Sequence, residues 1–310
     1  MIYYWPGQDY DIPSGGVRTH YDHVRILNAA GIAASILHMT PGFKCTWFTH
    51  NVPIAYAPTT TITPSDVLVM NEIMGPQTPH IAPGVRKVIF AQNVHYVWRG
   101  WPVPPTTIIP YTHGEVVATL VLTEFERNFF EWVWPTHPVY ITPHGIDGKM
   151  FPLGVAKKKQ IAYMPRKHAD EAQQVFGYLK ARGALDGWTV VPIDGMTQPQ
   201  VATVLAESLV FVPFGYPEGG TLPPFEAMAS GCAVVGYGGF ASDAMMARCG
   251  ATVTTSADTC QLTKELDRVL RSEPDFLAAA GRNASRMTLH TLSLEKEALA
   301  VTTAWRAIGV

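Results

Sequence analysis

The chain has 310 residues and a formal net charge of −2, with 47% hydrophobic and 15% charged residues. This composition excludes a disordered chain, and the near-neutral charge argues against a protein that binds duplex nucleic acid through a basic face. No apolar run reaches the roughly 18 residues of a membrane-spanning helix, and the start lacks a basic signal-peptide region, so we expect a cytoplasmic protein. The length suits two domains of ordinary size.

The first half of the chain predicts strands that alternate with helices, which is typical of a parallel α/β sheet. The expected strands cover residues 2–5, 32–39, 67–70, 88–90, 116–122 and 139–141, and the expected helices cover residues 17–30 and 124–134. Residues 41–64 contain several prolines and predict an irregular segment. We therefore expect residues 1–152 to form a first α/β domain.

The alternation restarts after residues 152–159, which we interpret as a linker that ends in three lysines. The expected strands cover residues 161–164, 188–193, 209–212 and 232–235, and the expected helices cover residues 168–182, 198–208, 223–230, 260–271 and 276–286. Residues 153–290 are thus expected to form a second α/β domain, and residues 291–310 hold a final amphipathic helix over residues 294–308. Two such domains place a ligand cleft between them, beside the carboxyl ends of the strands.

Two carboxylates, Glu218 and Glu226, stand eight positions apart around the start of an expected helix. Pro223 and Pro224 suit the first turn of that helix, where a missing N–H group is tolerated. Gly219 precedes them together with a second glycine, so the backbone can approach a ligand closely. Free N–H groups at the helix start favour an anion.

These features suit a ligand that carries both hydroxyl and phosphate groups, such as a sugar nucleotide. On the loop, Glu218 can hold sugar hydroxyls, and inside the helix, Glu226 can hold the diol of a ribose. The alternative is a plain turn followed by a helix with a favourable acidic first turn. The glycines, the two prolines and the strand on each side favour the ligand site.

Residues 218–231, E-G-G-T-L-P-P-F-E-A-M-A-S-G, resemble the E-x7-E region of retaining, GT-B-type glycosyltransferases of the glycosyltransferase family 4 group. The usual family form is close to E-G-F-G-L-P-P-L-E-A-M-A-x-G. This chain has Gly220 in place of an aromatic residue and Thr221 in place of a glycine. Both departures lie on the loop that the family uses for the donor.

The resemblance implies a GT-B architecture, with two Rossmann-like domains facing across a cleft and the helix of residues 291–310 crossing back to the first domain. It implies transfer of a sugar from a UDP-, GDP- or dTDP-sugar to an acceptor hydroxyl, with retention and without a required cofactor or metal. The acceptor can be a glycan, a lipid-linked molecule or a small molecule, with at most peripheral membrane contact and no nucleic acid. The donor phosphate takes the acceptor proton.

By the same resemblance, the second domain binds the donor through Glu226 and the backbone of Gly219, Gly220, Thr221 and Leu222. Glu218 then orients the donor sugar.

Three further sites follow strands or open helices and match positions that the family uses. Gly15 and Gly16 resemble the glycine pair near the donor phosphate, although a turn without a ligand is an equal alternative. Arg166 and Lys167 follow a strand, where cations stabilise a departing diphosphate. The family usually spaces its arginine and lysine further apart, so a solvated basic pair stays open.

A third position lies just past the strand of residues 88–90. Here His95 matches a polar position that the family has near the donor sugar, with Gln92 or Asn93 as alternative residues for it. The other interpretation is a surface or core histidine without a ligand. His144, in a segment that resembles P-N-G-V-D, is interpreted as a turn histidine. Trp98 and Trp101 are candidates for an acceptor groove or for core positions.

Two motif matches point elsewhere. Asp9-Tyr10-Asp11 fits D-x-D, a metal-binding motif of the other main glycosyltransferase fold, but its context favours a solvated loop. Residues 236–241 fit G-x-G-x-x-A, with Asp258 further along, as in dinucleotide-binding enzymes. The match comes late in the chain and leaves too little sequence for a whole dinucleotide domain.

Two other functional classes stay open beside the transferase. A different sugar-nucleotide enzyme on the same fold, such as an epimerase, would consume donor without an acceptor. A non-catalytic sugar- or nucleotide-binding subunit would bind a ligand and turn over nothing. The four cysteines, which have no metal-binding spacing, are expected to be reduced and mostly buried.

Overall fold

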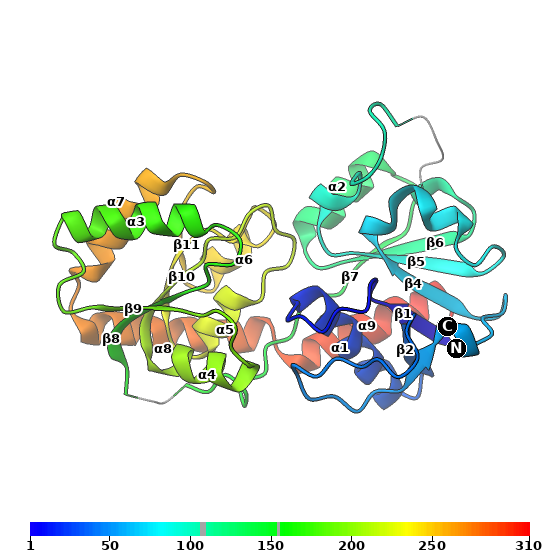
Figure 1. The fold of residues 1–310 in the computed structure, drawn as a ribbon, viewed down its shortest axis with the longest axis horizontal. Coiled ribbons are helices and arrows are strands. Elements are labelled where there is room, and N and C mark those ends of the chain that lie inside the picture. Colours follow the sequence, from blue (N-terminus) through cyan, green and yellow to red (C-terminus); the bar gives the residue numbers. More distant parts are fainter. Residues whose placement is uncertain (106–109, 154–155) are drawn as a thin grey trace. The chain divides into compact units, whose positions relative to one another are not determined.

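The computed structural model describes residues 1–105, 110–153 and 156–310. The described chain forms two compact units, Met1–His144 with Glu295–Val310, and Gly145–Leu294. Figure 1 shows each unit as a sheet between layers of helices. Among the described residues, no helix is long and apolar enough to cross a membrane.

A seven-stranded sheet forms the centre of the first unit, and all its strand pairs are parallel. Its strands are β1 (Ile2–Trp5), β2 (Ala34–His38), β3 (Ile54–Tyr56), β4 (Val67–Asn71), β5 (Arg86–Ala91), β6 (Val116–Val121) and β7 (Val139–Ile141). Their order is β3-β2-β1-β4-β5-β6-β7. The short β3 lies inside residues 41–64, so the prediction of an irregular segment there was partly wrong.

Alternate residues of these strands face opposite helical layers, as the period of a strand requires. Ile2, Tyr4, Val88 and Phe90 belong to the core beneath α1 (Gly15–Ala29) and α9 (Leu294–Ile308). Leu68, Met70, Ile89 and Ala91 belong to the two clusters of the opposite face, where α2 (Glu124–Val133) packs. The described part of this unit also has four short 3₁₀ helices: η1 (Ala57–Thr59), η2 (Glu72–His80), η3 (Val94–Tyr96) and η4 (Pro110–Thr112).

The final helix joins the first unit, although residues 145–294 separate it from the rest of that unit. Trp305 is fully buried, and its indole N–H donates to the Tyr4 hydroxyl at 2.9 Å. Both residues belong to the core beneath α1. The expected return of the last helix to the first domain is therefore confirmed.

A five-stranded sheet forms the centre of the second unit, in the order β12-β11-β10-β8-β9, with parallel strand pairs. The strands are β8 (Lys158–Tyr163), β9 (Thr189–Pro192), β10 (Ser208–Val212), β11 (Ala233–Gly236) and β12 (Thr252–Val253). The helices are α3 (Ala169–Ala181), α4 (Gln198–Glu207), α5 (Pro223–Ala229), α6 (Asp243–Arg248), α7 (Thr259–Leu270) and α8 (Pro274–Thr291). One core lies beneath α3 and α7, and another lies beneath α4, α5 and α8.

The lysines expected to end a linker are instead part of the second unit. Lys157 donates from Nζ to the carbonyl oxygens of Leu205 and Ser230, at 3.0 and 2.6 Å. Burial lowers the pKa of this ammonium group. Lys158 begins β8 and pairs with Glu207 at 2.8 Å. The expected linker was therefore too long at this end, while residues 154–155 of it lie outside the described residues.

Candidate functional site

The loop that carries Glu218 runs from the end of β10 to the start of α5. The Glu218 N–H group donates to the Gly239 carbonyl oxygen at 3.1 Å, and an isolated parallel bridge joins Glu218 to Phe240. The loop is thus bound through its backbone to the segment that follows β11. Because β10 and β11 are parallel neighbours, their carboxyl ends bring both loops to the same edge of the sheet.

Lys167 and Glu218, which are 51 residues apart in sequence, form an ion pair. Lys167 follows β8, the other neighbour of β10, so it reaches the same edge of the sheet. The two side chains keep 33% and 21% of their exposure, which leaves both accessible to a ligand. Arg166, the preceding residue, is exposed. The structure therefore brings two predicted catalytic residues together.

A second carboxylate beside this pair was not singled out from the sequence. Glu171, in the first turn of α3, accepts a hydrogen bond from the Tyr237 hydroxyl group, and its interaction with Tyr216 raises the pKa of that phenol. The Nδ1 atom of His168 lies 3.4 Å from Glu171 Oε1. The only sequence signal was an acidic first turn, which helices commonly have without any ligand.

The backbone of the predicted donor loop is partly bound within the protein. The Thr221 N–H group donates to Ser242 Oγ at 3.1 Å, and Ser242 Oγ donates to the Gly219 carbonyl oxygen at 2.9 Å. Thr221 itself is buried. A donor that uses the Thr221 amide would therefore have to displace Ser242.

Glu226 lies in the first turn of α5, as expected from the two prolines before it. Its backbone N–H group donates to the Leu222 carbonyl oxygen at 3.0 Å, and the residue is only 8% exposed. Pro223 and Pro224 open the helix, which confirms the predicted helix start. Carboxylate oxygens accept hydrogen bonds from hydroxyl groups, so Glu226 remains a candidate for holding a diol.

The glycines of the G-x-G-x-x-A match lie close to the protein's own chain. A Cβ atom on Gly236 would lie 2.7 Å from the Pro213 carbonyl oxygen, and one on Gly238 would lie 2.3 Å from Met246 Sδ. Gly239 has a φ of +78°, and its Cβ would lie 2.5 Å from the Gly215 carbonyl oxygen. Asp258 caps α7 by accepting from the Gln261 N–H group. Internal packing and capping therefore account for this motif without a dinucleotide.

In the first unit, the predicted glycine pair opens α1. The Gln92 side chain donates from Nε2 to the Gly16 carbonyl oxygen at 3.1 Å, and a Cβ on Gly16 would lie 3.1 Å from Gln92 Oε1. His95 is exposed in η3, and its N–H group donates to the Asn93 side chain at 3.0 Å. Gln92, one of the three alternatives at this strand end, thus reaches the glycine pair.

A buried carboxylate supports that contact. Glu72, which follows β4, accepts from the Gln92 N–H group at 3.2 Å and is 6% exposed. Burial raises its pKa to about 8, and the charge of the nearby Glu126 contributes in the same direction. Glu126 is itself buried, and burial raises its pKa to about 7. These two carboxyls had no distinctive pattern in the sequence.

The D-x-D segment is an irregular, largely exposed loop, as expected, and both aspartates are also hydrogen-bonded within the protein. Asp9 accepts from the backbone N–H groups of Met39 and Thr40, at 2.9 and 2.7 Å, and its Oδ1 lies 2.6 Å from His38 Nδ1. Asp11 accepts from the Thr46 N–H group at 2.8 Å. Both aspartates fasten the segment after β2. Within the described residues, no group of three or more His, Cys, Asp or Glu side chains is placed to hold a metal ion.

Three further groups of residues were named from the sequence: His144, Trp98 with Trp101, and the cysteines. His144 is buried, with Nδ1 3.4 Å from Thr19 Oγ1. Trp101 is buried, whereas Trp98 is 38% exposed and contacts it edge to face. The cysteines are free thiols, and Cys260 is the one that is exposed among them.

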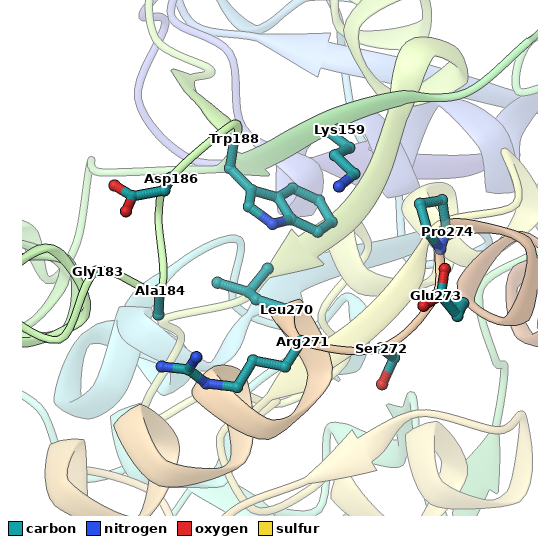
Figure 2. Close-up of a pocket in the computed structure, with 10 residues that line it drawn as sticks. All are labelled: Lys159, Gly183, Ala184, Asp186, Trp188, Leu270, Arg271, Ser272, Glu273 and Pro274. Carbon is teal, nitrogen blue, oxygen red and sulfur yellow. The ribbon is translucent and has the colours of Figure 1, made fainter.

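A shallow pocket of the second unit lies away from these residues (Figure 2). It lies at the amino ends of β8 and β9, whereas Lys167 and Glu218 lie beyond carboxyl ends of strands. Trp188 occupies its centre in Figure 2, with Lys159 and Leu270 on neighbouring sides. No residue predicted for the site lines it.

No family model matches the sequence. The chain is 25% identical over 236 residues to an α-1,6-glucosyltransferase from Actinobacillus pleuropneumoniae, a match that covers 73% of this chain and 70% of that protein. Sucrose-phosphate synthase from Thermosynechococcus elongatus has a similar structure, with a TM-score of 0.68, 14% identity and coverage of 99% and 98% of the two chains. Anabaena HepE, solved with UDP and glucose, has a TM-score of 0.69, 13% identity and coverage of 99% of both chains.

These structural neighbours are GT-B glycosyltransferases, and the similarity extends over nearly the whole chain. Each unit is built on a sheet of parallel strands, and the last helix belongs to the first unit. This is the architecture that the resemblance of the E-x7-E region implied. The chain therefore has the GT-B fold and is similar, in sequence and in structure, to glycosyltransferases.

Proposed function

We propose that this protein is a retaining glycosyltransferase that moves a sugar from a nucleotide-sugar donor to an acceptor hydroxyl group. The observation that carries the proposal is the Lys167–Glu218 ion pair at the carboxyl ends of the β8 and β10 strands. A cation and a carboxylate side by side match a sugar diphosphate, because the cation suits the phosphates and the carboxylate suits the sugar hydroxyls. The similarity to a curated glucosyltransferase supports the same reaction.

In this proposal the second unit binds the donor. Glu226 accepts from the ribose hydroxyls, and the backbone at Gly220 and Leu222 faces the phosphates or the sugar. Arg166 and Lys167 stabilise the departing diphosphate, and each is worth about 3 kcal/mol if it acts like a donor group of an oxyanion hole. Glu218 leaves Lys167 to orient the donor sugar. Acceptor binding is assigned to the first unit.

The chemistry conserves the anomeric configuration. The bond between the anomeric carbon and the diphosphate oxygen breaks, and the acceptor oxygen forms its bond on the same face. The acceptor proton passes to the departing phosphate oxygen, so no protein nucleophile is needed. In the first unit, Gly15, Gly16 and His95 remain candidate ligand positions, and Gln92 holds Gly16 in place.

The proposal is tested by incubating the protein with UDP-glucose, and then with GDP- and dTDP-glucose, with and without a panel of glycan acceptors. UDP-glucose comes first because the similar HepE structure contains UDP and glucose. We expect acceptor-dependent release of the nucleoside diphosphate, with an α-linked product in the proton NMR spectrum. Donor consumption without an acceptor would indicate the epimerase class instead. Binding without any turnover would indicate a non-catalytic subunit.

A further inference from the structure

The Glu171 carboxylate lies where three segments of the second unit meet. Its own segment is the first turn of α3, immediately after Lys167. Tyr237, which follows β11, donates its hydroxyl group to Glu171 Oε2, and the same carboxylate raises the pKa of Tyr216, two residues before Glu218. The α3 segment follows Lys167, and the Tyr216 segment carries Glu218. The Tyr237 segment carries Gly239, whose carbonyl oxygen accepts from the Glu218 N–H group.

The contacts of His168 strengthen the same junction. Its Nε2 atom donates to the Tyr216 carbonyl oxygen at 2.7 Å, and its ring stacks on the Tyr216 ring, with centroids 4.3 Å apart and an interplanar angle of 10°. The Tyr216 and Tyr237 rings meet edge to face at 5.9 Å. The backbone and the ring of Tyr216 are therefore both fixed by His168, the residue just before α3, whose Nδ1 atom lies 3.4 Å from Glu171 Oε1.

The backbone around Glu218 leaves little room for adjustment. The Glu218 N–H group is bonded to the Gly239 carbonyl oxygen, and a Cβ atom on Gly239 would lie 2.7 Å from Glu218 Cβ. A change in the position of Tyr216 or Tyr237 is therefore transmitted to Glu218. Burial raises the pKa of Tyr237, and the Glu171 charge adds to that effect, which is consistent with a phenol that stays protonated and donates.

We propose that Glu171 is a positioning residue, which sets the place of Glu218 by holding Tyr216 and Tyr237 while His168 fixes the Tyr216 backbone. The inference rests on the proposed function, because the value of a fixed Glu218 is that it meets the donor sugar. Glu171 itself does not contact the sugar or the diphosphate. Its partners hold the loop in the geometry that the reaction needs before a donor arrives, as a preorganised site requires.

The first test is hydrogen exchange, measured by mass spectrometry on the peptide that covers residues 214–222. In Glu171→Ala we expect this peptide to exchange at least about fivefold faster than in the wild-type protein, because the loop opens locally. Asp267→Ala is the matched control, since this carboxylate also holds two partners, Arg182 and Arg271, but lies on α7. Unchanged exchange of residues 214–222 in Glu171→Ala would overturn the proposal, whether or not the protein proves to be a transferase.

The second test separates positioning from folding and from binding. Glu171→Gln keeps the size of the side chain, and Tyr216→Phe removes a single hydroxyl group, so at least one of these variants is expected to fold. For both, we expect kcat for sugar transfer to fall by at least about tenfold while the Kd for UDP changes by less than about threefold. Equal losses in kcat and in UDP affinity would contradict a positioning role. Wild-type protein that binds none of UDP, GDP and dTDP and transfers no sugar would instead contradict the proposed function, and the exchange test would still decide on Glu171.

Discussion

The ammonium group of Lys167 and the carboxylate of Glu218 are ion-paired across two neighbouring strand ends of the second unit. Both side chains are partly exposed, so the pair contributes little to stability compared with a buried one. Its significance lies in function, since a donor brings a diphosphate that competes with Glu218 for Lys167. The proposed reaction requires this exchange of partners.

Replacement of Glu218 by glutamine tests that exchange. We expect Glu218→Gln to lower kcat by about 100-fold, on the scale of a lost transition-state contact, because the amide cannot accept from the sugar hydroxyls as a charged group does. The Kd for UDP should stay within about threefold of the wild-type value or improve, since Lys167 no longer has a competing partner. Calorimetric titration with UDP and steady-state kinetics measure the two quantities.

The control for this variant is Glu207→Gln, which removes the carboxylate that pairs with Lys158 at the start of β8. That pair lies at the amino end of the strand, so both kcat and Kd should be unchanged. A Glu218 variant whose UDP affinity collapses while bound donor still turns over would refute the assignment of Glu218 to the sugar.

A pair of glycine substitutions tests whether the close approach at Gly239 matters. Gly239 and Gly187 have nearly the same φ, +78° and +75°, but a Cβ on Gly187 meets no atom within 4 Å. Both alanine variants should lose about 1–2 kcal/mol of stability, because alanine is strained at positive φ. Gly239→Ala should lose stability beyond this common amount, and its kcat should fall by at least about tenfold, because the added Cβ displaces Glu218.

Thermal unfolding and steady-state kinetics of the two glycine variants provide the comparison. Equal melting temperatures and equal kcat values in Gly239→Ala and Gly187→Ala would show that the contact between Gly239 and the Glu218 loop is unimportant.

The buried carboxyl of Glu72 predicts a pH dependence of stability. Its pKa is raised from 4.5 to about 8 in the folded protein, so the folded state keeps a proton that the unfolded state loses. The contribution of Glu72 is therefore fully present below about pH 4.5 and is lost as the pH rises through about 8. Glu72→Gln should gain on the order of 4 kcal/mol over the wild-type protein at pH 8 and little at pH 4.5.

Chemical denaturation across this pH range measures the difference. The exposed Glu131 on α2 supplies the control, because Glu131→Gln should change stability equally at both pH values. A Glu72→Gln variant that is no more stable than the wild-type protein at pH 8 would show that the Glu72 carboxyl is ionised without penalty.

Much of the fold could be predicted from the sequence because burial on both faces makes parallel strands continuous apolar runs. β1 and α9 have the predicted bounds, and the start of α5 follows from its two prolines. The short strands β3 and β12 could not be predicted. β3 has three half-buried residues and β12 has two residues, which are too few to show the alternation of buried and exposed residues that marks a strand. Lys157 was misread because lysine is rarely buried.

The candidate site was predictable only where local chemistry marked it. Glycines, prolines and carboxylates within fourteen positions were enough to single out Glu218 and Glu226. Glu171 and Tyr237 are 66 residues apart, and nothing local links an acidic first turn to a tyrosine at a strand end. The partner of Gly16, Gln92, is 76 residues away and was one of three alternatives, which only the fold could separate.

Thermal shift measures most directly whether the second unit binds a nucleotide-sugar donor through Glu226. The protein is melted with UDP, GDP, dTDP, ADP, CMP and their common sugar conjugates, with Mg²⁺ or EDTA, and with NAD as a comparison. A ligand that binds only the folded chain raises the melting temperature. At a concentration of 100 times its Kd, it stabilises the folded state by about 2.7 kcal/mol. We predict a shift with one nucleotide, equal in Mg²⁺ and EDTA, that is lost in Glu226→Ala and kept in the control Glu265→Ala. No shift with any nucleotide, or a shift with NAD alone, would contradict the account.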